Sequence, residues 1–267
     1  MKVYLSADIE GTAGVTMWDQ VERGKPDFQE AREQMTAEVA AACEGLLDGG
    51  ATEVWVQDAH ATTINIIASR LPERTRLIRG WSGHPFFMLQ ALDETFGAIA
   101  LVGYHSRAGG GGNPLEHTMS TNLAEVRIND RPASEFLVHA YAAELLRVPV
   151  VFLSGDEALC REVASVNPAI GTAAVLSGIG NSTVSLHPAA AVRAIKEGAR
   201  KALSGDLGRC RVALPERFVV DLSFRKQQIA YKSSFYPGST LTGPTTVRFI
   251  AEGYYDVLRM FLFALYL

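Results

Sequence analysis

The sequence predicts an α/β protein: a mostly parallel sheet flanked by helices, with a smaller C-terminal α+β lobe. Short apolar runs typical of buried strands alternate with helical segments over residues 1–204, which is the pattern of a parallel sheet covered by helices. After residue 205 two strand-like runs, separated by a long polar stretch, precede one apolar helix. We therefore expect an α/β domain over residues 1–204 and a smaller lobe over 205–267. The boundary is approximate, and the two parts could form one integrated domain.

The first part of the chain supplies most of the expected elements. A strand over residues 2–7 precedes a long amphipathic helix over 27–47, which ends at the glycines after Asp48. A helix capped by Ser134 is expected to run to about Leu146. Further strands are expected in the runs TEVWVQD, RTRLIRG, GAIALVGYH, AEVRINDRP and VPVVFLSGD, and near residues 172–176.

The remaining elements complete the sheet and form the lobe. A helix should run from Pro188 to about Leu203, and RFVVDLSF and TTVRFI are expected strands of the lobe. The final helix, Tyr254–Leu267, is apolar on nearly every side, and such a helix is normally buried all round. Either the lobe and main sheet cover it, or a second chain does, which would make the protein a homo-oligomer.

Composition and charge exclude several classes of protein. A net charge of -4 and a pI near 5.9 give no basic footprint, which argues against a nucleic-acid partner. The apolar tract at residues 254–267 is shorter than the roughly 20 residues of a membrane span. The 3 cysteines lie far apart without CxxC spacing, as expected in a reducing compartment. No leader pattern precedes the first strand, so we expect a soluble, cytoplasmic protein without a membrane partner.

Acidic and imidazole side chains follow three of the expected strands. Asp8 and Glu10 end the first strand, Asp58 and His60 end the second, and His105 ends the strand GAIALVGYH. Ligands of an open parallel sheet collect at the carboxyl ends of its strands. We therefore expect these side chains to share one edge of the sheet.

A metal site is the chemistry that this set of residues favours. Asp8 and Glu10 are two apart, so their carboxylates should lie side by side, and one of them should take up a proton unless a cation lies between them. Two carboxylates with His60 and His105 suit zinc, manganese or a pair of such ions. The sequence therefore predicts a metal site formed by Asp8, Glu10, His60 and His105.

Other acidic residues and histidines of the chain have ordinary structural interpretations. Glu135 follows Ser134 and can complement the helix dipole. His117 can be a loop histidine beside the glycines at residues 109–112, a run that reads as a flexible loop. Asp156 and Glu157 are interpreted as acids at a helix N-terminus. Three further histidines are interpreted as structural: His84, His139 and His187.

The motifs SADIEG, QDAH, GYHSRAG, EHTMS, INDRPASE and YPGSTLTGPTTVRF occur in this order along the chain. In that order they resemble the zinc-dependent D-aminopeptidases linked to bacterial dipeptide-transport genes. The resemblance implies a two-zinc site, with Asp8 as the bridging ligand, and a catalytic His117. Its implied metal ligands are Asp8, Glu10, His60, His105 and Glu135. It also implies a ring-like decamer, whereas the four-glycine loop departs from the family and is expected to affect access or substrate choice.

Together these observations predict a zinc metallopeptidase. We expect a metal-dependent aminopeptidase with two zinc ions per subunit, acting on short peptides or aminoacyl amides, including those with N-terminal D-residues. His117 would serve as nucleophile or as general acid/base, and both roles stay open. The alternatives are an amidase for non-peptide amides and a non-catalytic small-molecule-binding protein on the same fold. A binding protein has no need of a proton-transfer group, so His117 argues against the latter.

Overall fold

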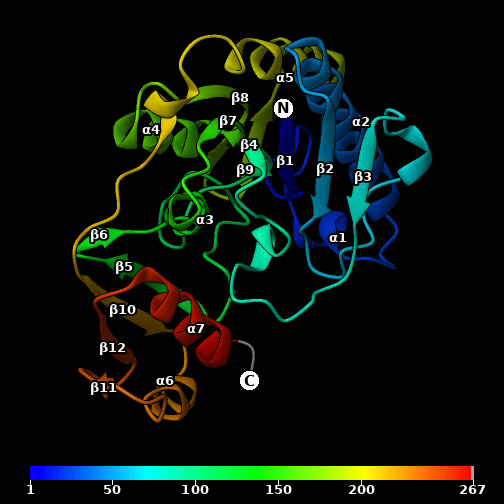
Figure 1. The fold of residues 1–267 in the computed structure, drawn as a ribbon. Coiled ribbons are helices and arrows are strands. Elements are labelled where there is room, and N and C mark those ends of the chain that lie inside the picture. The colour runs from blue at the N-terminus through cyan, green and yellow to red at the C-terminus, as the bar shows by residue number, and fades with distance from the viewer. Residues whose placement is uncertain (266–267) are drawn as a thin grey trace.

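Two β-sheets organise the protein, as the computed structural model of residues 1–265 shows (Figure 1). The larger sheet has seven strands in the order β3-β2-β1-β4-β7-β8-β9 and is parallel except for β9. Its strands are β1 (Lys2–Ala7), β2 (Glu53–Asp58), β3 (Thr75–Ile78), β4 (Phe96–Tyr104), β7 (Val150–Asp156), β8 (Gly171–Ile179) and β9 (Ser182–Ser185). The predicted α/β class with a mostly parallel sheet is confirmed.

The smaller sheet has five antiparallel strands in the order β11-β12-β10-β5-β6. These are β5 (Leu123–Ile128), β6 (Arg131–Pro132), β10 (Phe218–Phe224), β11 (Ser239–Leu241) and β12 (Thr246–Ala251). Two of them, β5 and β6, come from the middle of the chain and pair with β10 of the C-terminal part. The division into residues 1–204 and 205–267 stays a proposal about domains, and the smaller sheet draws strands from both ranges.

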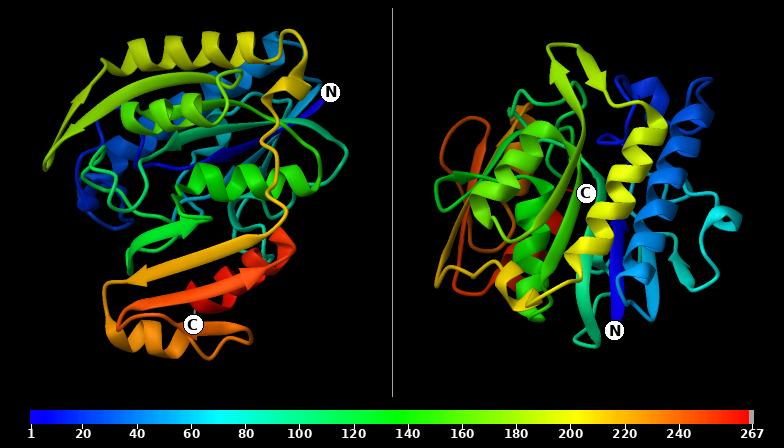
Figure 2. Two further views of the ribbon diagram at one scale, coloured as in Figure 1. Left: turned by 90° about the vertical axis from the view of Figure 1, so that its left-hand side faces the viewer. Right: turned by 90° about the horizontal axis from the view of Figure 1, so that it is seen from above.

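Helices cover both faces of the larger sheet, and others pack on the smaller sheet. They are α1 (Trp18–Val21), α2 (Phe28–Asp48), α3 (Glu135–Leu145), α4 (Glu157–Val166), α5 (Pro188–Ala202), α6 (Gln227–Ser233) and α7 (Tyr254–Leu265), with short 3₁₀ turns at Ala68–Arg70, Phe87–Leu89 and Leu207–Cys210. Helices α2 and α5 lie side by side on one face, and α3 and α4 lie on the other (Figure 2). A Cβ at Gly45 of α2 would lie 2.2 Å from the Lys196 carbonyl oxygen of α5, so glycine permits this close approach.

Most elements lie where the sequence predicts them, and the differences are local. The long polar stretch of the lobe contains α6 and β11, and β8 continues through a hairpin into β9; none of these three was expected. The last two residues of the predicted C-terminal helix, 266 and 267, lie outside the described residues. Among residues 1–265 there is no helix with the length and apolarity needed to cross a membrane.

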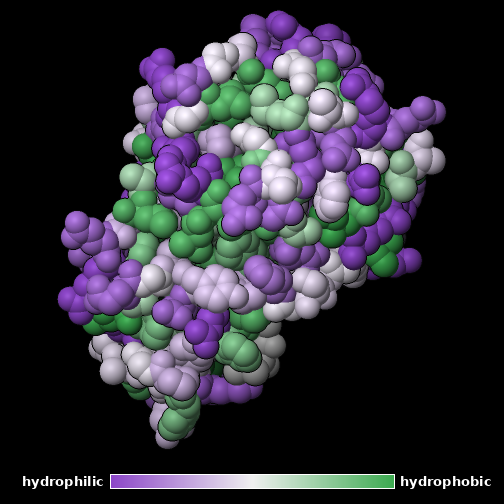
Figure 3. Space-filling model, viewed as in Figure 1, coloured by the Kyte–Doolittle hydropathy of each residue, from purple (hydrophilic) through white to green (hydrophobic). Residues whose placement is uncertain are grey.

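The C-terminal helix α7 is covered largely by its own chain. It packs against α3 and against β10, β12 and α6 of the lobe, and the Tyr254 hydroxyl donates to the Val138 carbonyl over 3.0 Å. Its outer side leaves Tyr255 and Phe263 44% and 51% exposed. On the face drawn in Figure 3, hydrophobic residues gather towards the middle of the left-hand side, and hydrophilic residues dominate the upper edge.

The register of the larger sheet brings three strand ends together. The central strand β1 lies between β2 and β4, and Ala7 at its end is opposite Asp58 of β2 and Val102 of β4. The loops that leave these three strands therefore begin at the same edge of the sheet. The smaller sheet and α3 border this edge, as Figure 1 shows.

Candidate metal centre

Four side chains from three strand ends meet at this edge of the sheet. Asp8 and Glu10 lie in the loop after β1, His60 follows β2, and His105 follows β4. All four are buried, with exposed fractions of 3%, 1%, 7% and 1% respectively. Glu135, the first residue of α3, joins them from the opposite side and is 3% exposed. The structure thus brings together all five residues that the sequence predicts as metal ligands.

Asp8 occupies the middle of the cluster. Its Oδ1 lies 3.2 Å from His60 Nδ1, and its Oδ2 lies 3.6 Å from His105 Nε2. His60 Nδ1 is also 3.1 Å from Glu10 Oε2, and His105 Nε2 is 3.8 Å from Glu135 Oε2. One carboxylate therefore faces a histidine on each side, an arrangement compatible with a ligand that bridges two metal ions.

The ligand atoms fall into three sets whose members all lie within 4.8 Å of one another. The first set is Asp8, Glu10 and His60, and the second is Asp8, His105 and Glu135. The third set combines Glu10 and His105 with His117. Asp8 belongs to both of the sets that contain only predicted ligands.

Backbone carbonyls fix the orientation of the two candidate ligand histidines. His60 Nε2 lies 3.0 Å from the Val21 carbonyl oxygen, and His105 Nδ1 lies 2.9 Å from the Ser106 carbonyl oxygen. A carbonyl only accepts, so these ring nitrogens carry the protons and donate. In the neutral ring the opposite nitrogen then has its lone pair directed at the carboxylates, as in most metal-ligating histidines.

The charges in the cluster are strongly coupled. Burial and the neighbouring Glu10 charge raise the pKa of Asp8 well above its usual value. Burial opposes ionisation of Glu10 as well, but His60 outweighs it and holds the pKa of Glu10 well below its usual value. Burial lowers the pKa of His105, whereas the carboxylates of Glu135, Glu10 and Asp8 raise it, to about 9.

The cluster therefore attracts positive charge, and its geometry fits a divalent cation. Glu10 Oε2 and His105 Nε2 are buried and make no hydrogen bond within the described part of the chain. A buried polar atom without a partner is costly, and a metal ion would satisfy both atoms. Carboxylate oxygens and imidazole nitrogens are ligands that zinc accepts. The residues present thus fit zinc.

Glycine lets the loop after β1 lie against the end of β4. A Cβ at Gly11 would lie 1.8 Å from the Tyr104 carbonyl oxygen. Gly103 has a φ of +72°, and a Cβ there would lie 2.2 Å from the Asp8 carbonyl oxygen. The backbones that carry Asp8 and His105 can approach this closely only with glycine at both positions.

His117 lies at the rim of the cluster. Its Nε2 is 3.6 Å from Glu135 Oε1, and its side chain is 15% exposed. Its Nδ1 lies 2.9 Å from the Leu115 carbonyl oxygen, so Nδ1 carries the proton and Nε2 is free to accept one. Of the three rings that face the cluster, His117 is the one with appreciable access to solvent.

Asn113, which sequence reasoning missed, connects the segment that carries His117 to the loop that carries Glu10. Its Nδ2 donates to the Glu10 carbonyl oxygen over 2.9 Å, and its Oδ1 accepts from the Leu115 amide over 2.9 Å. It is 4% exposed. No pattern around Asn113 in the sequence marks this role, because its contact with Glu10 depends on how two distant loops meet.

Asp156 supports the same region from behind the ligands. As the sequence suggests, it caps a helix: its Oδ1 accepts from the Leu159 amide of α4 over 2.8 Å. It also accepts from the amide and the hydroxyl of Ser106, over 2.5 and 2.6 Å. Ser106 directly follows His105, so Asp156 anchors the segment that positions this candidate ligand.

The other singled-out residues lie outside the cluster. Asp58, at the end of β2, accepts from the Asn65 and Ile66 amides over 2.6 and 2.8 Å, and this shapes the loop after His60. His187 caps α5 by accepting from the Ala189 amide, as its place before Pro188 suggests. His139 is fully buried within α3, with burial lowering its pKa, and His84 is exposed.

A cleft of about 310 Å³ opens onto the cluster. Trp18, Trp81, Met88 and Met119 form apolar parts of its wall, and no lysine or arginine occurs among the residues that line it. The Trp18 ring lies 5.8 Å from the His117 ring, measured between centroids. Neither tryptophan was predicted to line the site, since each stands in a loop or a short helix without a recognisable motif.

Comparisons with known proteins find similar chains of one family. A family model described as D-aminopeptidase matches residues 1–263. A D-aminopeptidase of Bacillus subtilis (strain 168) is 33% identical over 264 residues, covering 98% of this chain and 96% of that protein. A solved structure, the Zn-dependent D-aminopeptidase DppA from Bacillus subtilis, described as a self-compartmentalizing protease, is 32% identical. It superposes with a TM-score of 0.91 over 99% of this chain and 96% of that one.

Proposed function

The chain belongs to the D-aminopeptidase family, and we propose that it is a zinc metallopeptidase that removes N-terminal residues from short peptides or aminoacyl amides. Substrates with an N-terminal D-residue are included, because the relatives are D-aminopeptidases. The resemblance inferred from the motifs of the sequence is confirmed at the level of the family.

The observation that carries the proposal is the orientation of the two ligand histidines. His60 and His105 each donate one ring nitrogen to a backbone carbonyl, and each turns the other towards Asp8. Two three-residue sets that share Asp8 support two zinc ions per subunit, with Asp8 as the bridge. The proposed ligands are Asp8, Glu10, His60, His105 and Glu135.

The residues around the zinc ligands would orient the substrate and move a proton. Zinc held by this cluster would supply Lewis-acid polarisation of the scissile carbonyl and of water. His117, with Nε2 free to accept a proton, is placed to act as general acid/base beside the cluster, and the nucleophile role stays the alternative. The apolar wall formed by Trp18 and Trp81 would exclude water and contact a side chain of the substrate.

We also propose that the protein works as a closed homo-oligomer, with a decamer as the specific expectation. The structural relative is described as self-compartmentalizing, which supports an assembly that encloses its active sites. An enclosed site would admit short, unfolded peptides and exclude folded proteins. Cytoplasm remains the proposed compartment, because the 3 cysteines are all free and buried, as expected in a reducing environment.

A release assay over matched L- and D-aminoacyl amides tests the function. The metal-loaded protein should release the amino acid, chelation should abolish release, and added zinc should restore it. Turnover of non-peptide amides alone would favour the amidase alternative. Saturable binding of the aminoacyl amides without release would favour the non-catalytic binding protein and would refute the proposal.

A further inference from the structure

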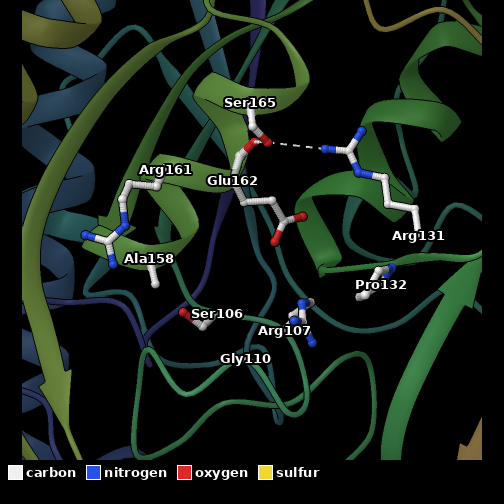
Figure 4. A pocket seen from close by; sticks show the side chains of 9 residues that line it. All are labelled: Ser106, Arg107, Gly110, Arg131, Pro132, Ala158, Arg161, Glu162 and Ser165. Carbon is white, nitrogen blue, oxygen red and sulfur yellow. Dashed lines mark hydrogen bonds between the residues drawn. The ribbon is translucent and has the colours of Figure 1, made fainter.

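A second cavity, of about 390 Å³, lies behind the metal ligands and has a different character from the active-site cleft. It is lined by the segment after His105, by β6 and by α4 (Figure 4). Polar and charged side chains dominate its wall: Ser106, Arg107, Arg131, Arg161, Glu162 and Ser165. None of the residues that line it also lines the cleft over the metal cluster.

Two of the arginines lack an acidic partner. Arg107 and Arg131 are half-buried, and neither forms an ion pair with any residue in the described range 1–265. Arg131 donates to the Ser165 hydroxyl over 3.3 Å, and Arg107 donates to the Ala108 carbonyl over 3.1 Å. Guanidinium groups prefer carboxylate or phosphate oxygens, which they bind through two parallel hydrogen bonds.

The acid in the cavity does not neutralise this charge. Glu162 points between Arg107 and Arg131 (Figure 4), yet it lies beyond ion-pairing distance of both. Its Oε1 instead accepts from the Ser134 hydroxyl over 2.6 Å. Burial raises the pKa of Glu162, although Ser134 and the arginines act in the opposite direction. The third arginine, Arg161, is already paired with Glu157 over 2.7 Å.

We propose that this cavity is a binding site for a small oxyanion ligand, whose carboxylate or phosphate oxygens bridge Arg107 and Arg131. The two guanidinium groups come from separate segments and face a common space that is large enough for a small organic acid or a phosphoryl group. An anion there would give both groups the partner that Glu162, held by Ser134, does not provide.

The cavity adjoins two segments that also carry candidate metal ligands, so a bound anion could influence the metal centre through them. Arg107 stands two residues after His105, and Ser134, which holds Glu162, directly precedes Glu135. The ligand would therefore contact the two segments that carry His105 and Glu135.

Titration calorimetry on the metal-loaded protein, freed of excess metal, tests the proposal. Inorganic phosphate and succinate are titrated separately. Saturable binding of phosphate alone assigns a phosphoryl ligand, of succinate alone a carboxylate ligand, and of both a general oxyanion site. Absence of saturable binding of either probe at millimolar concentration would overturn the proposal.

Variants locate the binding within the protein. The double variant Arg107→Gln, Arg131→Gln should bind at least tenfold more weakly, whereas Arg193→Gln, on the exposed side of α5, should bind as the parent does. Glu162→Gln should bind at least threefold more tightly, because it removes a negative charge and keeps an acceptor for Ser134. Damage to the fold would not weaken anion binding in the double arginine variant and also strengthen it in Glu162→Gln. Equal affinity in all variants would place the anion outside this cavity and refute the site.

Discussion

The imidazole rings of His105 and His117 stack, with their centroids 4.3 Å apart and their planes 23° from parallel. His105 turns Nε2 towards Asp8 inside the cluster, and His117 turns Nε2 towards Glu135 at its rim. The buried ring of His105 thus provides a fixed surface against which the more exposed ring of His117 is oriented. Two histidines in contact can in this way have separate roles, one as ligand and one in proton transfer.

Replacing His117 with alanine should separate these roles. Since His117 is placed for proton transfer, His117→Ala should keep its metal while turnover falls about 10²-fold or more. Elemental analysis and steady-state kinetics on the same preparation measure both quantities. His117 also lies within ligand distance of Glu10 and His105, so the result is informative in either direction. Loss of metal together with activity would make His117 a ligand and contradict the assignment.

Removing Asp8 should empty most of the metal centre. Asp8 is shared by both predicted ligand sets, so Asp8→Ala removes one ligand from each. We expect the parent to bind close to two zinc ions per chain and the variant to lose most of them. Asp19→Ala, which removes an exposed carboxylate that pairs with Lys25, serves as the control and should keep its metal. Full occupancy in Asp8→Ala would exclude the bridging role.

Much of the site follows from the sequence because of one property of parallel sheets. Asp8, Glu10, His60 and His105 each come directly after a recognisable strand, and adjacent parallel strands end at one edge. The same rule also selects Asp58, which shapes a loop instead, because position at a strand end does not determine where a side chain points.

The remaining residues of the site depend on contacts that spacing does not encode. Glu135 begins a helix and His117 stands in a loop, so only the family resemblance indicated them. Asn113, Trp18 and Trp81 were missed, because loops far apart in the chain bring them to the cluster. In the fold, the pairing of β5 with β10 was missed for the same reason, since antiparallel partners 92 to 101 residues apart carry no local signal.

Asn113 should act as a positioning residue for His117. Asn113→Ala removes the hydrogen bonds to the Glu10 carbonyl and from the Leu115 amide. Without them the segment that carries His117 has more conformational freedom. We expect kcat to fall about tenfold with KM and metal content nearly unchanged. The exposed Asn122, changed to alanine, is the control and should retain the parent kcat. An unchanged kcat, or loss of metal in Asn113→Ala, would contradict the positioning role.

Glu38 should make the stability of the protein depend on pH. Burial raises the pKa of this α2 carboxyl to about 7, although it accepts from the Ala13 amide and from Gln34. The folded state then keeps a proton that the unfolded chain releases at lower pH. The free energy of unfolding therefore falls as the pH rises from about 4.5 to about 7 and has lost this contribution above pH 7.

Glu38→Gln cannot ionise and should remove that part of the pH dependence. At pH 8 we expect the variant to be more stable than the parent by about 1–3 kcal/mol, and at pH 5 the difference should shrink or reverse. Urea unfolding of metal-loaded protein at several pH values measures the difference, and comparison within each pH cancels the effect of the metal. Glu30→Gln, an exposed change on the same helix, should show a constant difference. A constant difference for Glu38→Gln as well would contradict the assignment.

The protein should be a homo-oligomer in solution, because apolar side chains remain uncovered on the small lobe and on the β8–β9 hairpin, as well as on α7. Phe235 and Tyr231 on the small lobe are 70% and 59% exposed, with their rings 5.1 Å apart. Ile179 and Val184 on the β8–β9 hairpin are 64% and 59% exposed. Exposed apolar clusters of this kind favour association with another surface. Two separate clusters on one chain suit contacts with more than one neighbour, as a closed ring requires.

Light scattering coupled to size exclusion measures the assembly directly. The parent should elute as a species several times heavier than the 28.9 kDa chain, and a stable monomer at micromolar concentration would end the prediction. Phe235→Asp and Val184→Asp each place a charge in one cluster and should shift the population towards smaller species if that cluster is an interface. Lys201→Asp, at an exposed position of α5, changes charge outside these clusters and should leave the mass unchanged. Since the proposed metal ligands all come from one chain, a dissociated variant should still bind zinc, and this separates assembly from the integrity of the site.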